Sequence, residues 1–161
     1  MNAPRENCSA CGKARVTCVC ADVVRVDNRT EIVVLQHPRE RGHAIGTARF
    51  VDLGLTRSRV IVAGDEGGLA TRVPLLPGTA VLYPSDDADD LSTLPASEMP
   101  PALLVIDGTW AHAHTVVRAN PWIRELRAVR FTPAAESRYR IRKEPQADYV
   151  STLEAVVEAL S

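Results

Sequence analysis

The stretch ALLVIDGTWAHAH, residues 102–114, decides the fold class. Its uninterrupted apolar run is typical of a strand buried on both faces, as in a parallel sheet covered by helices. The apolar period then changes, because Trp110, Ala113 and Val117 recur at i, i+3 and i+7, which is one face of a helix. A helix is expected to end just before Pro121, since a proline disfavours helical backbone in the preceding residue.

The same alternation of strand and helix extends in both directions from this stretch. The apolar runs predict strands at residues 31–37, 58–64, 79–84, 102–107 and 128–132. The helical patterns lie at residues 46–55, 110–120, 121–126 and 151–160, the last with Ser151 as its N-cap and Glu154 three residues later. The pattern predicts an α/β fold with a mainly parallel sheet covered by helices.

Length and composition limit the class of protein. A chain of 161 residues with 45% hydrophobic content suffices for one core and a small appendage. We expect residues 1–21 to form a four-cysteine zinc-binding module and residues 22–161 to form the main domain. No stretch is long and apolar enough to span a membrane, and the N-terminus lacks the apolar core of a signal peptide. These features predict a cytoplasmic protein with reduced cysteines.

The net charge of −1 hides an uneven distribution. Residues 118–143 contain seven arginines and one lysine against two glutamates, whereas residues 86–90 form an acidic loop. The basic segment is suited to phosphates, and it is equally compatible with a solvated arginine-rich surface.

The four cysteines have the spacing C-x2-C-x6-C-x-C and are Cys8, Cys11, Cys18 and Cys20. Two close pairs of thiolates can converge on one tetrahedral ion, which would supply the folding energy that so short and polar a segment lacks. The spacing favours structural zinc over an iron–sulfur cluster, and disulfides would require an oxidising compartment. A closed set of four sulfurs leaves no open position for catalysis.

The histidines of the opening stretch resemble a metal pair, but the spacing does not suit one. His112 and His114 are about 200° apart on a helix and point to opposite sides. We expect one to be partly exposed and the other to be packed or to face the site. His37 ends a predicted strand, where it serves equally well as a structural residue or as a ligand contact.

Asp107 directly follows the apolar run, so its carboxylate is expected where a buried strand emerges. An aspartate, glycine or threonine here can cap the following helix. Strand ends in such sheets are also where ligands bind, which would make Asp107 a general base or a substrate anchor. Local chemistry alone favours the cap.

Six ordered blocks along nearly the whole chain resemble the DTW-domain family, the tRNA-uridine aminocarboxypropyltransferases. They are the cysteine cluster, LQHPRE with GTARF, LYP, IDGTW, YRIRKEP and STLEAV. The resemblance implies a SPOUT-like fold with a C-terminal knot. It also implies transfer of the 3-amino-3-carboxypropyl group of S-adenosylmethionine to N3 of a tRNA uridine, with methylthioadenosine released. The expected partner is tRNA, with no membrane and no obligate protein partner.

The resemblance also assigns site residues. It makes Asp107 the general base, with orientation of the uracil as its alternative role. Trp110 is expected to brace its loop in preference to stacking on a base. The cofactor contacts are expected from Gln36, His37, Leu82, Tyr83, Pro84, Ile106, Gly108, Thr109, Trp110, Ser151, Thr152 and Glu154. The tRNA contacts are expected from Arg118, Tyr139, Arg140, Arg142 and Lys143.

The sequence departs from the family pattern in the helix after the tryptophan, which reads AHAH where basic residues are usual. This weakens the case for RNA binding by the helix itself. Two rival functions fit the same motifs. One is a SPOUT-type RNA methyltransferase, and the other is a non-catalytic zinc-containing RNA-binding module. Ribosomal RNA is an alternative substrate within the wider superfamily.

Overall fold

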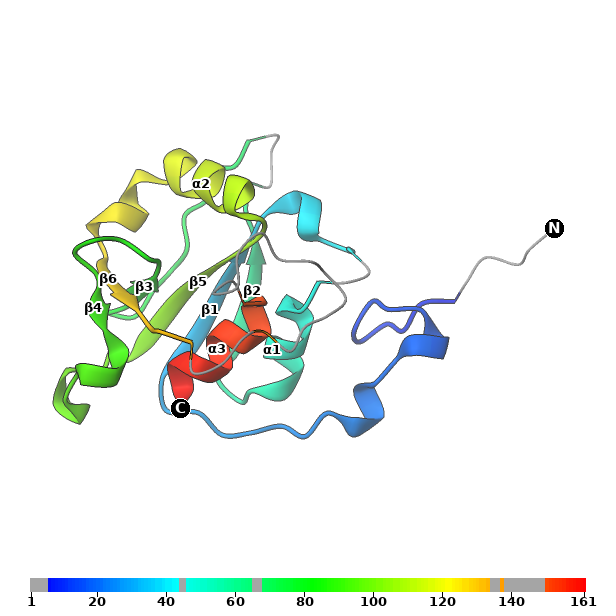
Figure 1. The fold of residues 1–161 in the computed structure, drawn as a ribbon. Helices are drawn as coiled ribbons and strands as arrows, with labels where there is room; N and C mark the ends of the chain where they lie inside the picture. Colours follow the sequence, from blue (N-terminus) through cyan, green and yellow to red (C-terminus); the bar gives the residue numbers. More distant parts are fainter. Residues whose placement is uncertain (1–5, 44–45, 65–67, 134–136, 138–149) are drawn as a thin grey trace.

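The fold is a six-stranded parallel sheet with helices on both faces (Figure 1). The computed structural model describes residues 6–43, 46–64, 68–133, 137 and 150–161. The strand order is β2-β1-β5-β3-β6-β4, and every pairing between neighbours is parallel. The predicted α/β class with a mainly parallel sheet is therefore confirmed. The strands are β1 (Glu31–Gln36), β2 (Ser58–Val62), β3 (Ala80–Leu82), β4 (Asp89–Asp90), β5 (Ala102–Asp107) and β6 (Arg127–Arg130).

The three α-helices cover the two faces of the sheet unequally. Helices α1 (Ala48–Gly54) and α3 (Thr152–Leu160) pack on one face, where their apolar residues meet Ile32, Val34 and Leu103. Helix α2 (Trp110–Ala119) and the 3-10 helix η6 (Pro121–Glu125) pack on the other, against alternate residues of the same strands. Successive residues of a strand point to opposite faces, so apolar runs such as that of β5 fill both cores.

The carboxyl ends of the parallel strands lie along one edge of the sheet. Gln36, the last residue of β1, pairs with Asp107, the last residue of β5. After β1 the chain passes through the 3-10 helix η3 (Pro38–Glu40) to α1 on one face, whereas after β5 it continues into α2 on the other. Such a point of divergence between neighbouring strands is where open α/β sheets bind ligands.

Most elements are shorter than the sequence predicts, although β5 has the predicted bounds, and one strand was not predicted. Part of the acidic loop forms β4, which pairs with β6 at the edge of the sheet. Arg127 Nε donates to Asp89 Oδ2 at 2.7 Å, while Asp90 caps the 3-10 helix η4 (Leu91–Thr93). A run of aspartates gives no strand signal, so only the tertiary pairing with β6 accounts for β4. The short helix predicted at residues 121–126 is the 3-10 helix η6, Pro121–Glu125.

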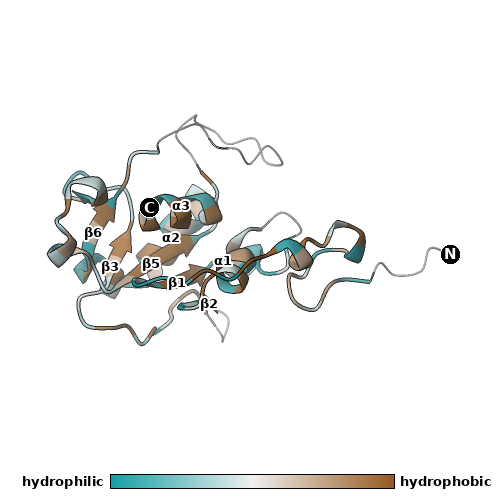
Figure 2. Ribbon diagram, turned by 90° about the horizontal axis from the view of Figure 1, so that it is seen from below, coloured by the Kyte–Doolittle hydropathy of each residue, from teal (hydrophilic) through white to brown (hydrophobic). Residues whose placement is uncertain are grey.

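The cysteine-bearing segment lies beside α1, away from the middle of the sheet (Figure 2). Its described residues contain two 3-10 turns, η1 (Arg15–Thr17) and η2 (Cys20–Asp22), and an isolated antiparallel bridge between Asn7 and Ala14. The Lys13 ammonium lies 5.4 Å from the centre of the Phe50 ring of α1. A further 3-10 helix, η5 (Ala96–Glu98), precedes β5 in the main domain. Among the described residues, none of the helices has the length and apolar character required to cross a membrane.

Candidate functional site

Asp107 lies at the point where β1 and β5 diverge, and both of its carboxylate oxygens are engaged. Gln36 Nε2 donates to Oδ2 at 2.8 Å, and Thr152 Oγ1 donates to Oδ1 at 2.5 Å. The residue is 5% exposed. Both donors are neutral, and one of them, Thr152, is the first residue of α3, where the helix dipole stabilises an anion. Asp107 thus joins a strand end to the start of α3, a helix that begins 45 residues later in the chain.

Asp107 does not cap the following helix, so that local interpretation is wrong. Thr109 is the N-cap of α2, and its hydroxyl accepts a hydrogen bond from the His112 amide at 3.2 Å. Alternate residues of a strand point to the same face of the sheet. The Asp107 side chain therefore lies on the face of Leu103 and Val105, which pack toward α1 and α3, and not on the face that α2 covers. The strand ends before the helical backbone begins, and the intervening turn places a different residue at the cap.

The start of α3 is fixed by a capping box. Ser151 Oγ accepts from the Glu154 amide at 3.3 Å, and Glu154 Oε2 accepts from the Ser151 amide at 2.8 Å. This confirms the predicted N-cap. Thr47 adds a contact that the sequence did not predict, since its hydroxyl accepts from the Leu153 amide at 3.2 Å. No periodic pattern in the sequence relates this buried threonine, which precedes α1, to the C-terminal helix.

The histidines of α2 point apart, as their spacing predicts. The exposed His114 has its Nδ1 3.2 Å from the Tyr83 hydroxyl. His112 is partly buried and faces the other way, with Nδ1 3.0 Å from Glu40 Oε1. In the described part of the chain, neither belongs to a group of potential metal ligands. Glu40 is nearly buried and was missed by sequence reasoning, because a charged residue after a proline normally indicates an exposed turn.

His37 is buried and has a structural role, one of the two that its position was expected to allow. Its Nδ1 accepts from the Arg39 amide at 3.1 Å and so caps η3. Its ring stacks on that of His112, with centroids 4.0 Å apart and planes within 6°. Burial, together with the nearby His112 and Arg39, lowers the pKa of His37 below its usual value. His37 is therefore held as a neutral ring beside His112.

Gly108 is required by these two rings. Its φ is +157°, and a Cβ placed on it would lie 2.9 Å from the His112 Cβ and 3.4 Å from the His37 Cβ. The contact is too close for any larger residue without movement of the α2 start. The absence of a side chain at Gly108 thus lets the backbone come close to the side chains of His112 and His37.

The remaining predicted cofactor residues surround this edge. Tyr83 follows β3 directly, and burial raises its pKa above the usual value. Trp110 is 37% exposed and meets Tyr83 edge-on, with centroids 6.3 Å apart. Leu82 and Ile106 are half-buried and Pro84 is exposed. The strand ends therefore bring together residues that the sequence separates by more than twenty positions.

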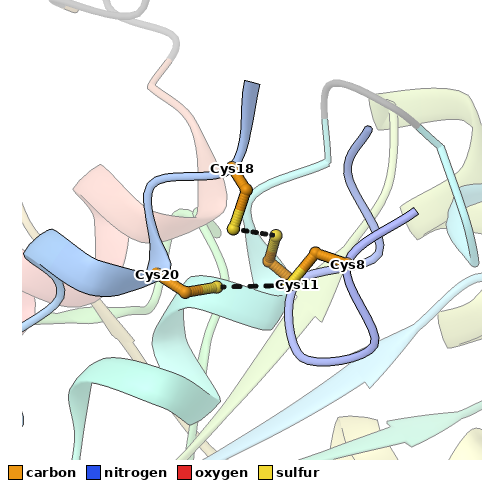
Figure 3. Close-up of side chains that lie close together, drawn as sticks. All are labelled: Cys8, Cys11, Cys18 and Cys20. Atoms are coloured by element: carbon orange, nitrogen blue, oxygen red, sulfur yellow. Dashed lines mark hydrogen bonds between the residues drawn. The ribbon is translucent and has the colours of Figure 1, made fainter. Parts of the chain in front are cut away.

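The four cysteines converge on one point (Figure 3). Their sulfur atoms all lie within 4.8 Å of one another. The Cys8–Cys20 and Cys11–Cys18 sulfur distances are 3.9 and 3.8 Å. Four sulfurs at 2.3 Å from a tetrahedral zinc would be about 3.8 Å apart, whereas a disulfide requires about 2.05 Å. The cluster therefore fits a metal ion, and all four thiols are free.

The thiols influence one another's protonation. Backbone amides of Cys11 and Ala10 lower the pKa of Cys8 to about 6. Hydrogen bonding with Cys11 and burial raise the pKa of Cys20 to about 12. Neighbouring thiolates repel one another, which raises the pKa of a thiol among them unless a cation neutralises the charge. The raised pKa of Cys20 therefore agrees with a set of thiols that binds a metal ion.

The predicted tRNA contacts are only partly within the described residues. Arg118 is exposed near the end of α2. Tyr139, Arg140, Arg142 and Lys143 lie outside the described residues.

Comparison with known proteins gives consistent relatives. The chain is 31% identical over 166 residues to tRNA-uridine aminocarboxypropyltransferase 2 of Drosophila melanogaster, covering 98% of this chain and 66% of that protein. It is 29% identical over 167 residues to the Mus musculus protein of the same name, covering 98% and 56%. It is 29% identical over 194 residues to tRNA-uridine aminocarboxypropyltransferase A of Arabidopsis thaliana, covering 97% and 72%. No solved structure matches the chain significantly.

The chain spans between 56% and 66% of the length of the fly and mouse relatives. A family model described as the DTW domain matches residues 5–161, which is nearly the whole chain. The chain belongs to the DTW domain family.

Proposed function

We propose that this protein transfers the 3-amino-3-carboxypropyl group of S-adenosylmethionine to N3 of a uridine in tRNA. The observation that carries the proposal is the convergence of the family motifs, distant in sequence, at the strand ends around Asp107. The relatives named as tRNA-uridine aminocarboxypropyltransferases support the same reaction. The by-product is methylthioadenosine.

The donor binds at the edge formed by the ends of β1, β3 and β5 and the start of α3. S-adenosylmethionine supplies a γ-carbon that its sulfonium already activates, so the reaction needs no catalytic metal. The chain's main task is alignment of that carbon with N3 of the uridine. Leu82, Tyr83 and Ile106 provide apolar surface for an adenine, since they are half-buried beside the strand ends.

Asp107 acts on the uracil in this proposal. Its role as general base comes from the family motif and stays a prediction. The geometry supports the alternative role, because two neutral donors already stabilise the carboxylate and each oxygen retains a lone pair. A free lone pair at the strand ends can accept the N3–H group and orient the ring.

Other parts of the proposal concern residues away from the reacting atoms. Cys8, Cys11, Cys18 and Cys20 hold a structural zinc ion, since their spacing matches a tetrahedral site. Arg118, together with the segment containing Tyr139, Arg140, Arg142 and Lys143, contacts tRNA. The main domain has a SPOUT-like topology with a C-terminal knot, a proposal that rests on the family resemblance; α3 packs beside α1 (Figure 1).

The test uses total tRNA and donor labelled in turn on its carboxyl and methyl carbons, followed by nucleoside mass analysis. Carboxyl label in a modified uridine supports the proposal. Methyl label would instead identify an RNA methyltransferase, and tRNA binding without label would identify a non-catalytic module. Carboxyl label confined to added ribosomal RNA would correct the substrate class.

Substitution of Asp107 by asparagine is predicted to lower the transfer rate by about 10²- to 10⁴-fold, because the variant keeps the shape but loses the anionic acceptor. The measurement is single-turnover transfer with saturating donor, accompanied by calorimetric donor titration. Donor affinity is expected to change little. Wild-type transfer by Asp107→Asn would remove Asp107 from the mechanism.

A further inference from the structure

A glutamate–histidine pair lies at the same edge of the sheet and has no role in the function proposed above. Glu40 Oε1 and His112 Nδ1 are 3.0 Å apart. The Glu40 side chain is 9% exposed, whereas that of His112 is 24% exposed. A nearly buried carboxylate thus orients a ring that still reaches solvent. In many enzymes this arrangement prepares an imidazole to accept a proton.

The hydrogen bond determines which ring nitrogen is free. An ionised glutamate only accepts hydrogen bonds, so the proton of a neutral His112 must be on Nδ1. Nε2 then carries the lone pair. His37 stacks on this ring and stays neutral, because its own Nδ1 accepts the Arg39 amide and its pKa is lowered. The neighbouring ring therefore fixes His112 without adding a positive charge.

Two further contacts fix the position of His112. Its backbone amide donates to the Thr109 hydroxyl, and the absence of a side chain at Gly108 lets the ring lie against the turn after β5. The charged and titratable groups that face the stacked rings from the segment after β1 are Glu40, Arg39 and His37. The Asp107 carboxylate, on the neighbouring strand end, is turned to the other face toward Thr152.

We propose that His112 is a catalytic residue whose Nε2 takes the proton from N3 of the target uridine, with Glu40 as its positioning residue. This inference rests on the proposed function. In the step, the N3 electron pair forms a bond to the γ-carbon of the sulfonium donor. The carbon–sulfur bond breaks, and its electron pair goes to sulfur to give a neutral thioether. The N3 proton goes to Nε2, and the Glu40 carboxylate balances the resulting imidazolium charge.

Proton affinity favours an imidazole over a carboxylate for this step. The N3 proton of uridine is lost only above neutral pH, and a general base works best when its pKa is close to the working pH. Imidazoles ordinarily titrate near about 6.5 and aspartates near about 3.9. A uridine has a single N3 proton, so His112 takes the place of Asp107 as its acceptor, and Asp107, with both oxygens hydrogen-bonded, holds the end of β5 at the start of α3.

The experiment is the single-turnover transfer rate between about pH 5 and 9, with donor and tRNA saturating. We expect the wild-type rate to fall toward low pH. His112→Asn keeps an amide where Nδ1 donates to Glu40, and it should lower the neutral-pH rate about 10²- to 10⁴-fold and abolish this acid limb. Added imidazole should restore part of the rate to His112→Ala. Glu40→Gln should shift the acid limb to lower pH, because the charge that stabilises the imidazolium is lost.

The matched control is His43→Asn, since His43 is an exposed histidine outside the site. Its pH profile should coincide with that of the wild type. The inference is overturned if His112→Asn retains the wild-type acid limb, or if Asp107→Asn loses that limb while His112→Asn does not. An unshifted limb in Glu40→Gln would overturn the role of Glu40. A wild-type protein that transfers no aminocarboxypropyl group would instead overturn the proposed function.

Discussion

At the scale of single residues, the turn between β5 and α2 shows how closely conformation and site are linked. Asp107, Gly108 and Thr109 follow one another, yet each serves a different neighbour. The first binds Gln36 and Thr152, the second makes room for two imidazoles, and the third caps α2. A substitution of Asp107 is therefore expected to affect activity, one of Gly108 to affect packing, and one of Thr109 to affect the stability of α2.

Gly108→Ala is predicted to destabilise the protein by about 1–3 kcal/mol, because its Cβ would lie 2.9 Å from that of His112 and its φ of +157° is unfavourable for alanine. The measurement is urea unfolding followed by far-ultraviolet circular dichroism. Gly54→Ala is the matched control. A Cβ there meets nothing within 4 Å, so this variant is expected to be neutral or slightly more stable. Equal stability of the two variants would contradict the assigned packing.

His37 is predicted to make stability depend on pH. Its folded pKa is lowered, so the unfolded chain takes up a proton more readily as pH falls below about 6.5. The stabilisation is complete above the unfolded pKa and decreases as pH falls toward the folded pKa. His37→Asn retains an acceptor for the Arg39 amide. Its unfolding free energy should lack the part of the pH dependence that comes from His37. The measurement is the unfolding free energy of the wild type and of His37→Asn at several pH values. An equal dependence on pH in the two proteins would refute the role of His37.

At the scale of elements, α3 belongs to the site although it lies far from it in sequence. Three hydroxyl groups hold its N-terminus: that of Ser151 caps the helix, that of Thr152 donates to Asp107, and that of Thr47 accepts from the Leu153 amide. The polar start of α3 thus meets the strand ends while its apolar face packs beside α1. Loss of helix order is expected to release one donor from the Asp107 carboxylate.

Ser151→Ala is predicted to cost about 0.5–2 kcal/mol of stability, because the Glu154 amide loses its acceptor at the N-terminus of α3. Hydrogen exchange measured by mass spectrometry should show faster exchange in α3 than in β1. Ser97→Ala, at an exposed serine of η5, provides the control and should leave both regions unchanged. Unchanged exchange of α3 in Ser151→Ala would mean that the cap does not hold this helix.

At the scale of the whole molecule, two parts of the chain depend on different sources of stability. The sheet buries apolar residues on both faces, whereas Cys11 is the one buried apolar residue among the described residues of the cysteine segment. Its order is expected to come from a bound ion and from the contact of Lys13 with Phe50.

Removal of the metal is therefore predicted to unfold the cysteine segment and to leave the sheet intact. The purified protein should contain about one zinc ion per chain. After chelation, amides between Cys8 and Cys20 should exchange rapidly while those of β1 and β5 stay protected. Cys11→Ser should give the same pattern without chelator, and Ser9→Ala should not. Zinc-free protein with a protected cysteine segment would refute a structural metal.

The sequence by itself determined the parallel α/β class, the capped helix α3 and the cysteine set, because periodicity, capping residues and ligand spacing are local signals. The tertiary structure alone decided the partners of Asp107, the burial of Glu40, the stacking of His37 on His112 and the strand formed by the acidic loop. These features depend on which strand ends are neighbours in the sheet. Strand order is a long-range property, and no local pattern of residues encodes it.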